Sequence, residues 1–330
     1  MPLSQSLLPS QMSQPPVDLD VMFGDIRMPR PQKAHLNNTK VINYISSTTD
    51  ELFDRTLRIK TLIRKNVSVT VDLTAGDNLY LSNPNITQYD RAVMDSAYTL
   101  MENGAGVFTP EMIVRVMCGN PDADVTPQKV GAVTRSINKL SMIRITIDCT
   151  DELVARKKIK PGQKALLTSY LMPVREITVR SANHLADMRG YQFLEKPVLY
   201  SYAEQVKQII SFDTRLLKNG GDLSNTDEVI IIKRYLIRRI EMLKNSRNDV
   251  CSGKISYQWY DAKRNEEKGM FHALGYDPKN YRQWKVKRNK IHGYVTAILN
   301  DFIKDNYIDG YEVNREDRNR IAGVTVIVKT

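Results

Sequence analysis

The sequence predicts a helix-rich α+β protein with two consecutive units that share one order of elements. Two Thr-Pro pairs, Thr109-Pro110 and Thr126-Pro127, each place a capping side chain before a proline at the first helical position. A strand-like alternation of apolar residues follows them from Ile143. After the break at Asn219-Gly220-Gly221, helices and then a hairpin occur again. Three helices followed by a hairpin is the order of a winged-helix domain, so we expect two tandem winged-helix domains and a flexible N-terminal arm.

Length and charge limit the classes of protein. The chain has 330 residues, 42% of them hydrophobic, which is enough for two cores. Lys and Arg outnumber Asp and Glu by 48 to 37, giving a formal charge of +11. This excess favours a polyanionic partner, most commonly nucleic acid. The N-terminus lacks a signal-peptide pattern and no stretch is apolar enough to span a membrane, so we expect a cytoplasmic protein.

Changes in composition and turn signals divide the chain. Residues 1–45, rich in Ser, Gln and Pro, are expected to form a disordered or loosely docked arm. Residues 46–190 are expected to form the first winged-helix domain, with an N-terminal extension that contains a helix over 50–65 and a strand near 67–71. Residues 191–222 are expected to be a connector with a short helix at 202–210, and residues 223–330 the second winged-helix domain.

The third helix of the first unit is expected at Gln128 to Leu140. An earlier helix should start at Thr87, whose side chain and that of Asp90 are spaced as a capping box. The hairpin after the third helix is expected to carry a basic loop, with an insertion over 150–160.

The third helix of the second unit is expected from about Tyr281 to Phe302. Its first half is strongly basic, and Ile291, Val295 and Ile298 begin an apolar stripe that buries one side of its second half. A DNA-recognition helix has this character, with its N-terminal part offered to a groove and its body anchored. The alternative is a solvated surface helix. A shorter helix is expected before it, at 257–263.

Several stretches resemble the tandem winged-helix replication initiators (Rep proteins) of plasmids and mobile elements. They include residues 89–119, 133–152, 170–179, 198–217 and 225–245. The resemblance implies binding to repeated origin sequences, local opening of the duplex, and recruitment of host replication proteins such as those that load helicase. It also implies dimers that repress their own transcription, so a homodimer is a further expectation. The long N-terminal region and the insertion in the first hairpin depart from the family pattern.

Enzymatic motifs are missing from the sequence. A rolling-circle nuclease needs a closely spaced histidine pair for its metal, whereas His35, His184, His272 and His292 are far apart. No GxxxxGK[ST] phosphate-binding loop occurs, and three scattered cysteines do not form a zinc pattern. We therefore expect no catalytic residue, no metal and no cofactor.

Positive side chains are the candidate DNA contacts. Arg282 and Arg288 are the candidates for base contacts, because a guanidinium group can pair with guanine through two hydrogen bonds. Trp284 is expected to pack on its own domain, with base stacking as the alternative. The other candidates are expected to contact phosphates: Lys279, Lys285, Lys287, Lys290, Arg315, Arg318 and Arg320 in the second unit, and Lys129, Arg135, Lys139, Lys157 and Lys158 in the first.

The sequence leads to one preferred function and several alternatives. The preferred function is sequence-specific binding of double-stranded DNA at the replication origin of a bacterial plasmid or mobile element, without enzymatic activity. A transcriptional regulator or partition protein with the same domains is the nearest alternative. A protein-binding scaffold and a nuclease are alternatives from other classes.

Overall fold

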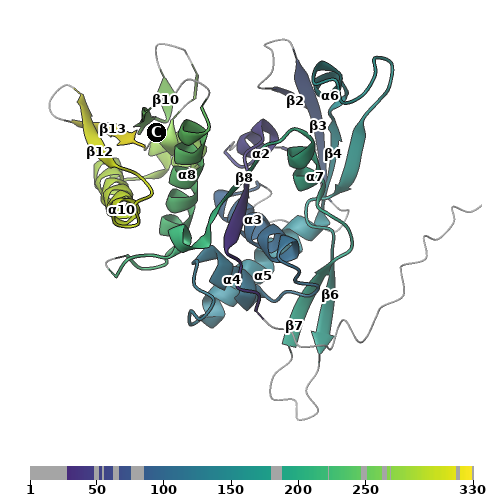
Figure 1. Cartoon of the computed structure of the whole chain (residues 1–330), viewed down its shortest axis with the longest axis horizontal. Coiled ribbons are helices and arrows are strands. Elements are labelled where there is room, and N and C mark those ends of the chain that lie inside the picture. Colours follow the sequence, from purple (N-terminus) through teal and green to yellow (C-terminus); the bar gives the residue numbers. More distant parts are fainter. Residues whose placement is uncertain are drawn as a thin grey trace, which may run out of the picture.

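The computed structural model describes residues 28–47, 52–53, 56–61, 67–75, 85–179, 188–221, 223–246, 251–261, 266–267, 269–316 and 320–328. Helices and small antiparallel sheets are mixed along the chain, so the protein belongs to the α+β class (Figure 1). The buried apolar side chains form two clusters, one in each half of the molecule. Among the described helices, none combines the length and apolar character needed to cross a bilayer.

The first cluster joins a four-stranded sheet to a group of helices. The sheet has the order β2-β3-β4-β5, with all neighbours antiparallel. Thr87 and Asp90 form the predicted capping box, and Thr109 and Thr126 cap their helices as expected. The elements are β2 (Thr56–Lys60), β3 (Ser68–Ala75), α3 (Gln88–Glu102), α4 (Pro110–Met117), α5 (Pro127–Met142), β4 (Ile143–Asp148) and β5 (Leu166–Tyr170).

Two details of the first unit differ from the sequence prediction. The helix expected over 50–65 is wrong, because Thr56–Lys60 is strand β2, in which Leu57 and Ile59 alternate as buried residues with exposed ones. The insertion in the first hairpin contains a short helix, α6 (Thr150–Ala155). Beyond the hairpin, β6 (Val174–Val179) and β7 (Met188–Phe193) form a separate two-stranded ladder.

The expectation of a loose arm over 1–45 is wrong for its last part. Strand β1 (Lys33–Asn37) pairs with β8 (Ile209–Asp213), and α2 (Lys40–Ile45) follows it directly. The physical reason is local. Leu36 is buried in β1, and Thr39 caps a helix that buries Val41 and Ile42. Residues 1–27 lie outside the described part of the chain.

The region expected to be a connector is also built into the fold. Its helix, α7 (Val198–Gln205), begins four residues before the predicted start and ends before the predicted end. β8 and a short 3-10 helix, η1 (Thr214–Leu217), follow it. Gly119, at the end of α4, lies against this segment with φ +63, and a Cβ there would be 2.6 Å from the backbone nitrogen of Lys218. Only glycine satisfies both conditions at this position.

The second cluster forms around a long helix, α8 (Asp227–Lys244), and a three-stranded sheet of order β12-β13-β9. The sequence of elements is helix, strand, short helix, long helix and hairpin. A helix expected at 257–263 is wrong, because Tyr260–Asp261 is β10 and pairs with β11 (Glu266–Glu267). The others are β9 (Ser252–Ser256), α9 (Met270–Ala273), η2 (Pro278–Asn280), α10 (Trp284–Lys304), β12 (Gly310–Glu316) and β13 (Arg320–Ile327).

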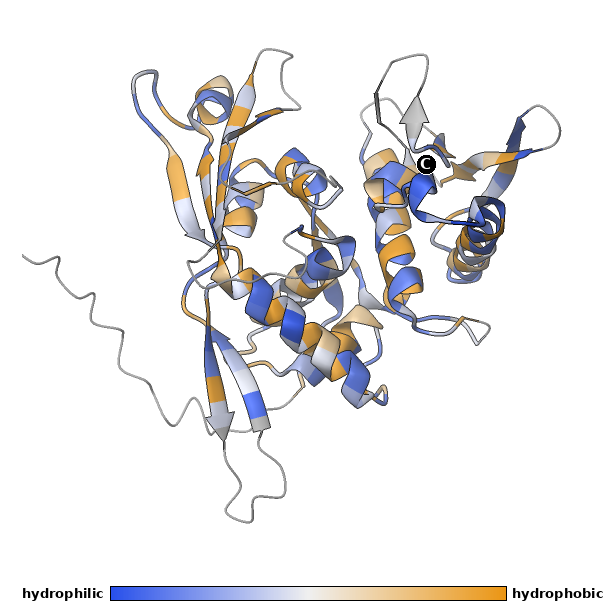
Figure 2. Ribbon diagram, turned by 180° about the vertical axis from the view of Figure 1, so that it is seen from behind, coloured by the Kyte–Doolittle hydropathy of each residue, from blue (hydrophilic) through white to orange (hydrophobic). Residues whose placement is uncertain are grey.

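Helix α8 connects the two units. One side of it buries Ile232, Leu236 and Ile240 in the second cluster, while Arg234 on another side donates to Ser96 of α3 at 2.7 Å. The helices of both units carry apolar and polar residues on different sides, as the alternating colours in Figure 2 show. α8 is therefore enclosed on two sides, which is why its charged residues include buried ones.

Candidate nucleic-acid interface

Helix α10 is anchored through its second half. Ile291, Val295, Ile298 and Phe302 are fully buried, so the predicted apolar stripe is confirmed. The helix begins at Trp284, three residues later than expected: η2, capped by Asp277, ends at Asn280, and a turn separates it from α10. The buried second half of α10 thus immobilises the helix that carries the basic residues of the first half.

Exposed basic residues lie on and around α10 and the neighbouring hairpin. β12 follows α10 directly and lies beside it in Figure 1. Arg318 lies outside the described residues. Of the predicted DNA contacts in this region, the exposed ones are Lys279, Arg282, Lys285, Lys290, Arg315 and Arg320; Lys304, in the last turn of α10, is exposed as well.

Lys287 is different, because the fold of the second unit uses its charge. Its ammonium group forms an ion pair with Glu228 of α8 and lies 5.1 and 5.2 Å from the ring centroids of Tyr276 and Tyr281. Lys290 is 3.8 Å from the other oxygen of Glu228, with its side chain 57% exposed, so that pair is loose. Lys287 therefore fixes the start of α10 on α8, whereas Lys290 remains available to a ligand.

Arg288 faces the hairpin. Together with Arg320 and Glu316 it lines a cavity of about 180 Å³ between α10 and the hairpin. Burial lowers the pKa of Arg288, the nearby Arg320 lowers it further, and Glu316 opposes both. Arg320 forms an ion pair with Glu316, while Nε of Arg288 has no hydrogen-bond partner among the described residues. Two guanidinium groups thus share one carboxylate at this junction, an arrangement that suits an added anion.

Trp284 packs within its own unit, as expected. Its ring lies 4.9 Å from that of Phe271 in an edge-to-face arrangement and 5.6 Å from that of Tyr281. These contacts orient the first turn of α10.

The candidate residues of the first unit are less available. Lys139 forms an ion pair with the capping residue Asp90 and donates to the backbone oxygen of Asn85 at 3.0 Å, with only 14% of its side chain exposed. Lys129 lies near Asp227 at the start of α8, where burial raises the pKa of the Asp227 carboxyl and Lys129 partly opposes this rise. Arg135 is exposed. Of the three basic residues predicted on α5, Arg135 is therefore the exposed one, whereas Lys129 and Lys139 are partly buried.

Lys157 and Lys158 are exposed, but they do not lie with α5. They follow α6 in the loop between β4 and β5. Figure 1 shows α6 at one end of the four-stranded sheet and α5 beyond the other end. The structure thus does not bring these two lysines together with Lys129 and Arg135.

Three further positions on α10 went unnoticed in the sequence. Val286 is 61% exposed, and Asn289 and Gly293 are exposed on the same side as Lys285. A Cβ at Gly293 would meet no atom within 4 Å, so packing does not require a glycine in this helix interior. The sequence signal for these positions is their spacing of three or four residues, which places them on the side of α10 opposite the apolar stripe.

Comparisons with known proteins identify no relative by sequence. No protein-family model matches the chain, and no curated protein matches it. Two crystal structures of domains 2 and 3 of RctB are similar in structure, each with a TM-score of 0.44. They share 11% and 9% sequence identity with this chain, and the match covers 88% of this chain and 96% and 97% of theirs.

Proposed function

We propose that the protein is a non-enzymatic, sequence-specific binder of double-stranded DNA and that its second unit is a winged-helix domain. The observation that carries this proposal is the set of exposed basic residues on one anchored helix and the adjoining hairpin. The order of elements in this unit, apart from the added β10–β11 pair, and the sheet order β12-β13-β9 support this assignment. In such a domain the third helix enters the major groove and the hairpin lies along the DNA backbone.

The geometry suggests separate tasks for the side chains of α10 and its surroundings. Arg282, Lys285 and Asn289 are exposed on or just before the first turns of α10, where they would face base edges. Arginine suits guanine and asparagine suits adenine, each through two hydrogen bonds. Arg288 and Arg320, which share Glu316, suit a phosphate of the backbone better than a base. Of the two arginines expected to contact bases, Arg282 and Arg288, this proposal therefore keeps Arg282 in that role.

The biological task that we propose is initiation of replication at the origin of a plasmid or mobile element. It rests on the resemblance of the sequence to the tandem winged-helix initiators. Under this proposal the chain binds repeated sites, as a monomer or homodimer, and recruits host replication proteins in the cytoplasm. A transcriptional regulator or partition protein of a mobile element would use the same DNA-binding surface and is the second candidate.

The DNA-binding proposal is tested by nuclease protection of the DNA that flanks the gene. If repeats occur there, the fragments that contain them are used. Lys285→Ala and Arg288→Ala are compared with Lys304→Ala, a matched control in the last turn of the same helix, 72% exposed. We expect the first two to weaken protection about tenfold at constant salt and the control to leave it unchanged. Equal protection by all the variants would refute the assignment of α10.

The replication proposal needs a separate test. A plasmid that carries the protected repeats and lacks another origin is introduced into cells with or without the protein. Maintenance only in the presence of the protein would support the initiator. Protected repeats without plasmid maintenance, together with repression of a reporter promoter, would favour the regulator.

A further inference from the structure

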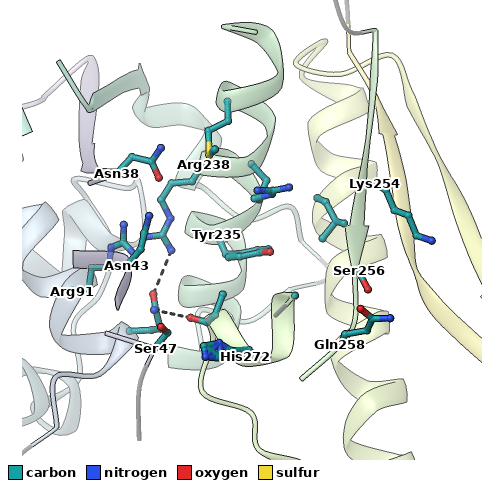
Figure 3. Close-up of a pocket in the computed structure, with 16 residues that line it drawn as sticks. Asn38, Asn43, Ser47, Arg91, Tyr235, Arg238, Lys254, Ser256, Gln258 and His272 are labelled. Atoms are coloured by element: carbon teal, nitrogen blue, oxygen red, sulfur yellow. Dashed lines mark hydrogen bonds between the residues drawn. The ribbon is translucent and has the colours of Figure 1, made fainter. Parts of the chain in front are cut away.

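A cavity lies where α2, α3, α8, β9 and α9 meet, between the two units (Figure 3). Its volume is about 740 Å³, within the roughly 300–1,000 Å³ that is usual for small-molecule sites. Four of the residues that line it carry positive charge, and no carboxylate is found among the described lining residues. The four are Arg91, Arg238, Arg239 and Lys254.

The positive charge behind this cavity is not neutralised within the described structure. Arg91, Arg234 and Arg238 are 2%, 3% and 5% exposed, and Asp95 is the carboxylate that acts on all three. One oxygen of Asp95 already accepts from the hydroxyl of Tyr200 at 2.6 Å and from the backbone of Asn37 at 3.1 Å. One carboxylate cannot balance three guanidinium groups, and an unpaired buried charge costs several kcal/mol.

The pKa values of these arginines agree with the excess of buried guanidinium groups over carboxylates. Burial lowers the pKa of Arg91 to about 10, with Asp95 opposing. Burial also lowers the pKa of Arg238 strongly, and the neighbouring Arg91 adds to the effect. A bound anion would reverse these effects, since it stabilises the charged form of each group.

Some hydrogen-bond donors of these side chains also have no acceptor among the described residues. Nε of Arg91 and Nε of Arg239 donate to no described atom. Arg238 reaches the amide oxygen of Gln88 at 3.3 Å, and the amide nitrogen of Gln88 donates to the backbone oxygen of Ala273 at 2.7 Å, as the dashed lines in Figure 3 show. Buried donors are normally paired, and these two belong to side chains that line the cavity.

We propose that this cavity binds a small molecule with two or more phosphate groups, of the size of a nucleoside triphosphate. Guanidinium groups bind phosphate through paired hydrogen bonds, and about four positive charges match a diphosphate or triphosphate. Tyr235 and the side-chain amides of Asn38, Asn43 and Gln258 also line the cavity and provide stacking and hydrogen-bonding groups for a base.

The position of the cavity gives the ligand a structural effect. Gln88 and Arg91 belong to α3 of the first unit, whereas Arg238 and Arg239 belong to α8. A ligand held by both helices stabilises the arrangement in which they are in contact. Its binding would therefore bias how the two units are placed on DNA.

Binding is tested by isothermal titration of the full chain with ATP, tripolyphosphate and adenosine as probes. We expect one molecule of ATP or tripolyphosphate per chain and no binding of adenosine at the same concentration. Absence of binding of both phosphate probes at 1 mM, on the order of ordinary cellular ligand levels, would overturn the proposal. ATP bound at least tenfold more tightly than tripolyphosphate indicates a nucleotide site, and equal binding indicates a polyphosphate site.

Variants separate this cavity from the DNA-binding surface, which also attracts anions. Arg239→Gln and Lys254→Gln avoid the fully buried arginines and should each weaken ATP binding at least tenfold. Arg58→Gln, at an exposed position in β2, is the matched control and should bind normally. Lys285→Gln should also bind ATP normally. Loss of ATP binding in Lys285→Gln, with normal binding in Arg239→Gln, would overturn the proposal.

Discussion

The third helices of the two units, α5 and α10, have similar positions in their units but offer different surfaces. On α10 and just before it, Arg282, Lys285 and Lys290 are exposed. On α5, Lys139 is tied to Asp90, and Lys129 lies beside Asp227 of the other unit. The comparison teaches that a basic residue in a recognition helix counts as a DNA contact only if the fold does not already use its charge.

The strongest test of this comparison is the substitution Lys139→Ala. It leaves the carboxylate of Asp90, which is 5% exposed, without its cation. We expect the free energy of unfolding to fall by about 3 kcal/mol. Urea denaturation followed by circular dichroism measures this change. Lys285→Ala is the matched control and should change stability by less than about 0.5 kcal/mol. Weaker DNA binding by Lys139→Ala without loss of stability would contradict the comparison.

Lys233 extends the comparison to a lysine buried in α8. The residue as a whole is 2% exposed, its ammonium group donates to the backbone oxygen of Lys218 at 2.9 Å, and burial lowers its pKa from 10.5 to about 8. Between about pH 8 and 10.5 the unfolded chain holds a proton that the folded chain has lost. Stability should therefore rise with pH in this window.

The substitution Lys233→Met removes this titration. We expect it to raise stability at pH 7 by about 2 kcal/mol, since the cost of burying the charge exceeds the value of one hydrogen bond. The difference from the wild type should shrink as the pH increases to 10.5. Urea melts at pH 7 and pH 10 measure both effects, and a difference that does not depend on pH would contradict the assigned pKa.

Gly293 provides a test on the exposed side of α10. Gly293→Leu should stabilise the helix by roughly 0.5–1 kcal/mol, because a Cβ there meets no atom and leucine favours helices. If DNA approaches this side closely, the same substitution should weaken DNA binding about tenfold, or about 1.4 kcal/mol. Gly293→Ala is the smaller control. Fluorescence anisotropy with a labelled duplex measures affinity, and unchanged affinity in Gly293→Leu would place the DNA elsewhere.

The smallest expected effect concerns Arg135 of α5. Its exposed side chain is at most one phosphate contact, so Arg135→Ala should reduce affinity about threefold or less. The slope of log affinity against log salt should become less steep by about 1. A loss as large as that of Lys285→Ala would show that α5 and α10 bind DNA equally, which would end the distinction between them.

Local signals were sufficient to predict much of the fold. The Thr caps at 87, 109 and 126 and the apolar stripe of α10 depend on residues within one or two turns, and the structure confirms them. Strand β2 was misread because Leu57 and Ile59 alternate over only five residues, too few to outweigh a mixed charged run.

Long-range contacts explain the rest. The partner of Lys287 is Glu228, 59 residues away, and that of Lys139 is Asp90, 49 residues away. A sequence without its fold cannot show such pairs, so exposed and engaged lysines look alike. For the same reason the sequence does not reveal that Arg234 of α8 is buried against Ser96 of α3.

The pairing of β1 with β8 has a consequence for synthesis of the protein. His35 in β1 bonds to Ser211 in β8, 176 residues later in the chain. Because the ribosome delivers the N-terminus first, β1 must wait for its partner until most of the first unit has emerged. The first unit can therefore close only after its last strand has left the exit tunnel, and an N-terminal segment released early needs protection from other pairings until then.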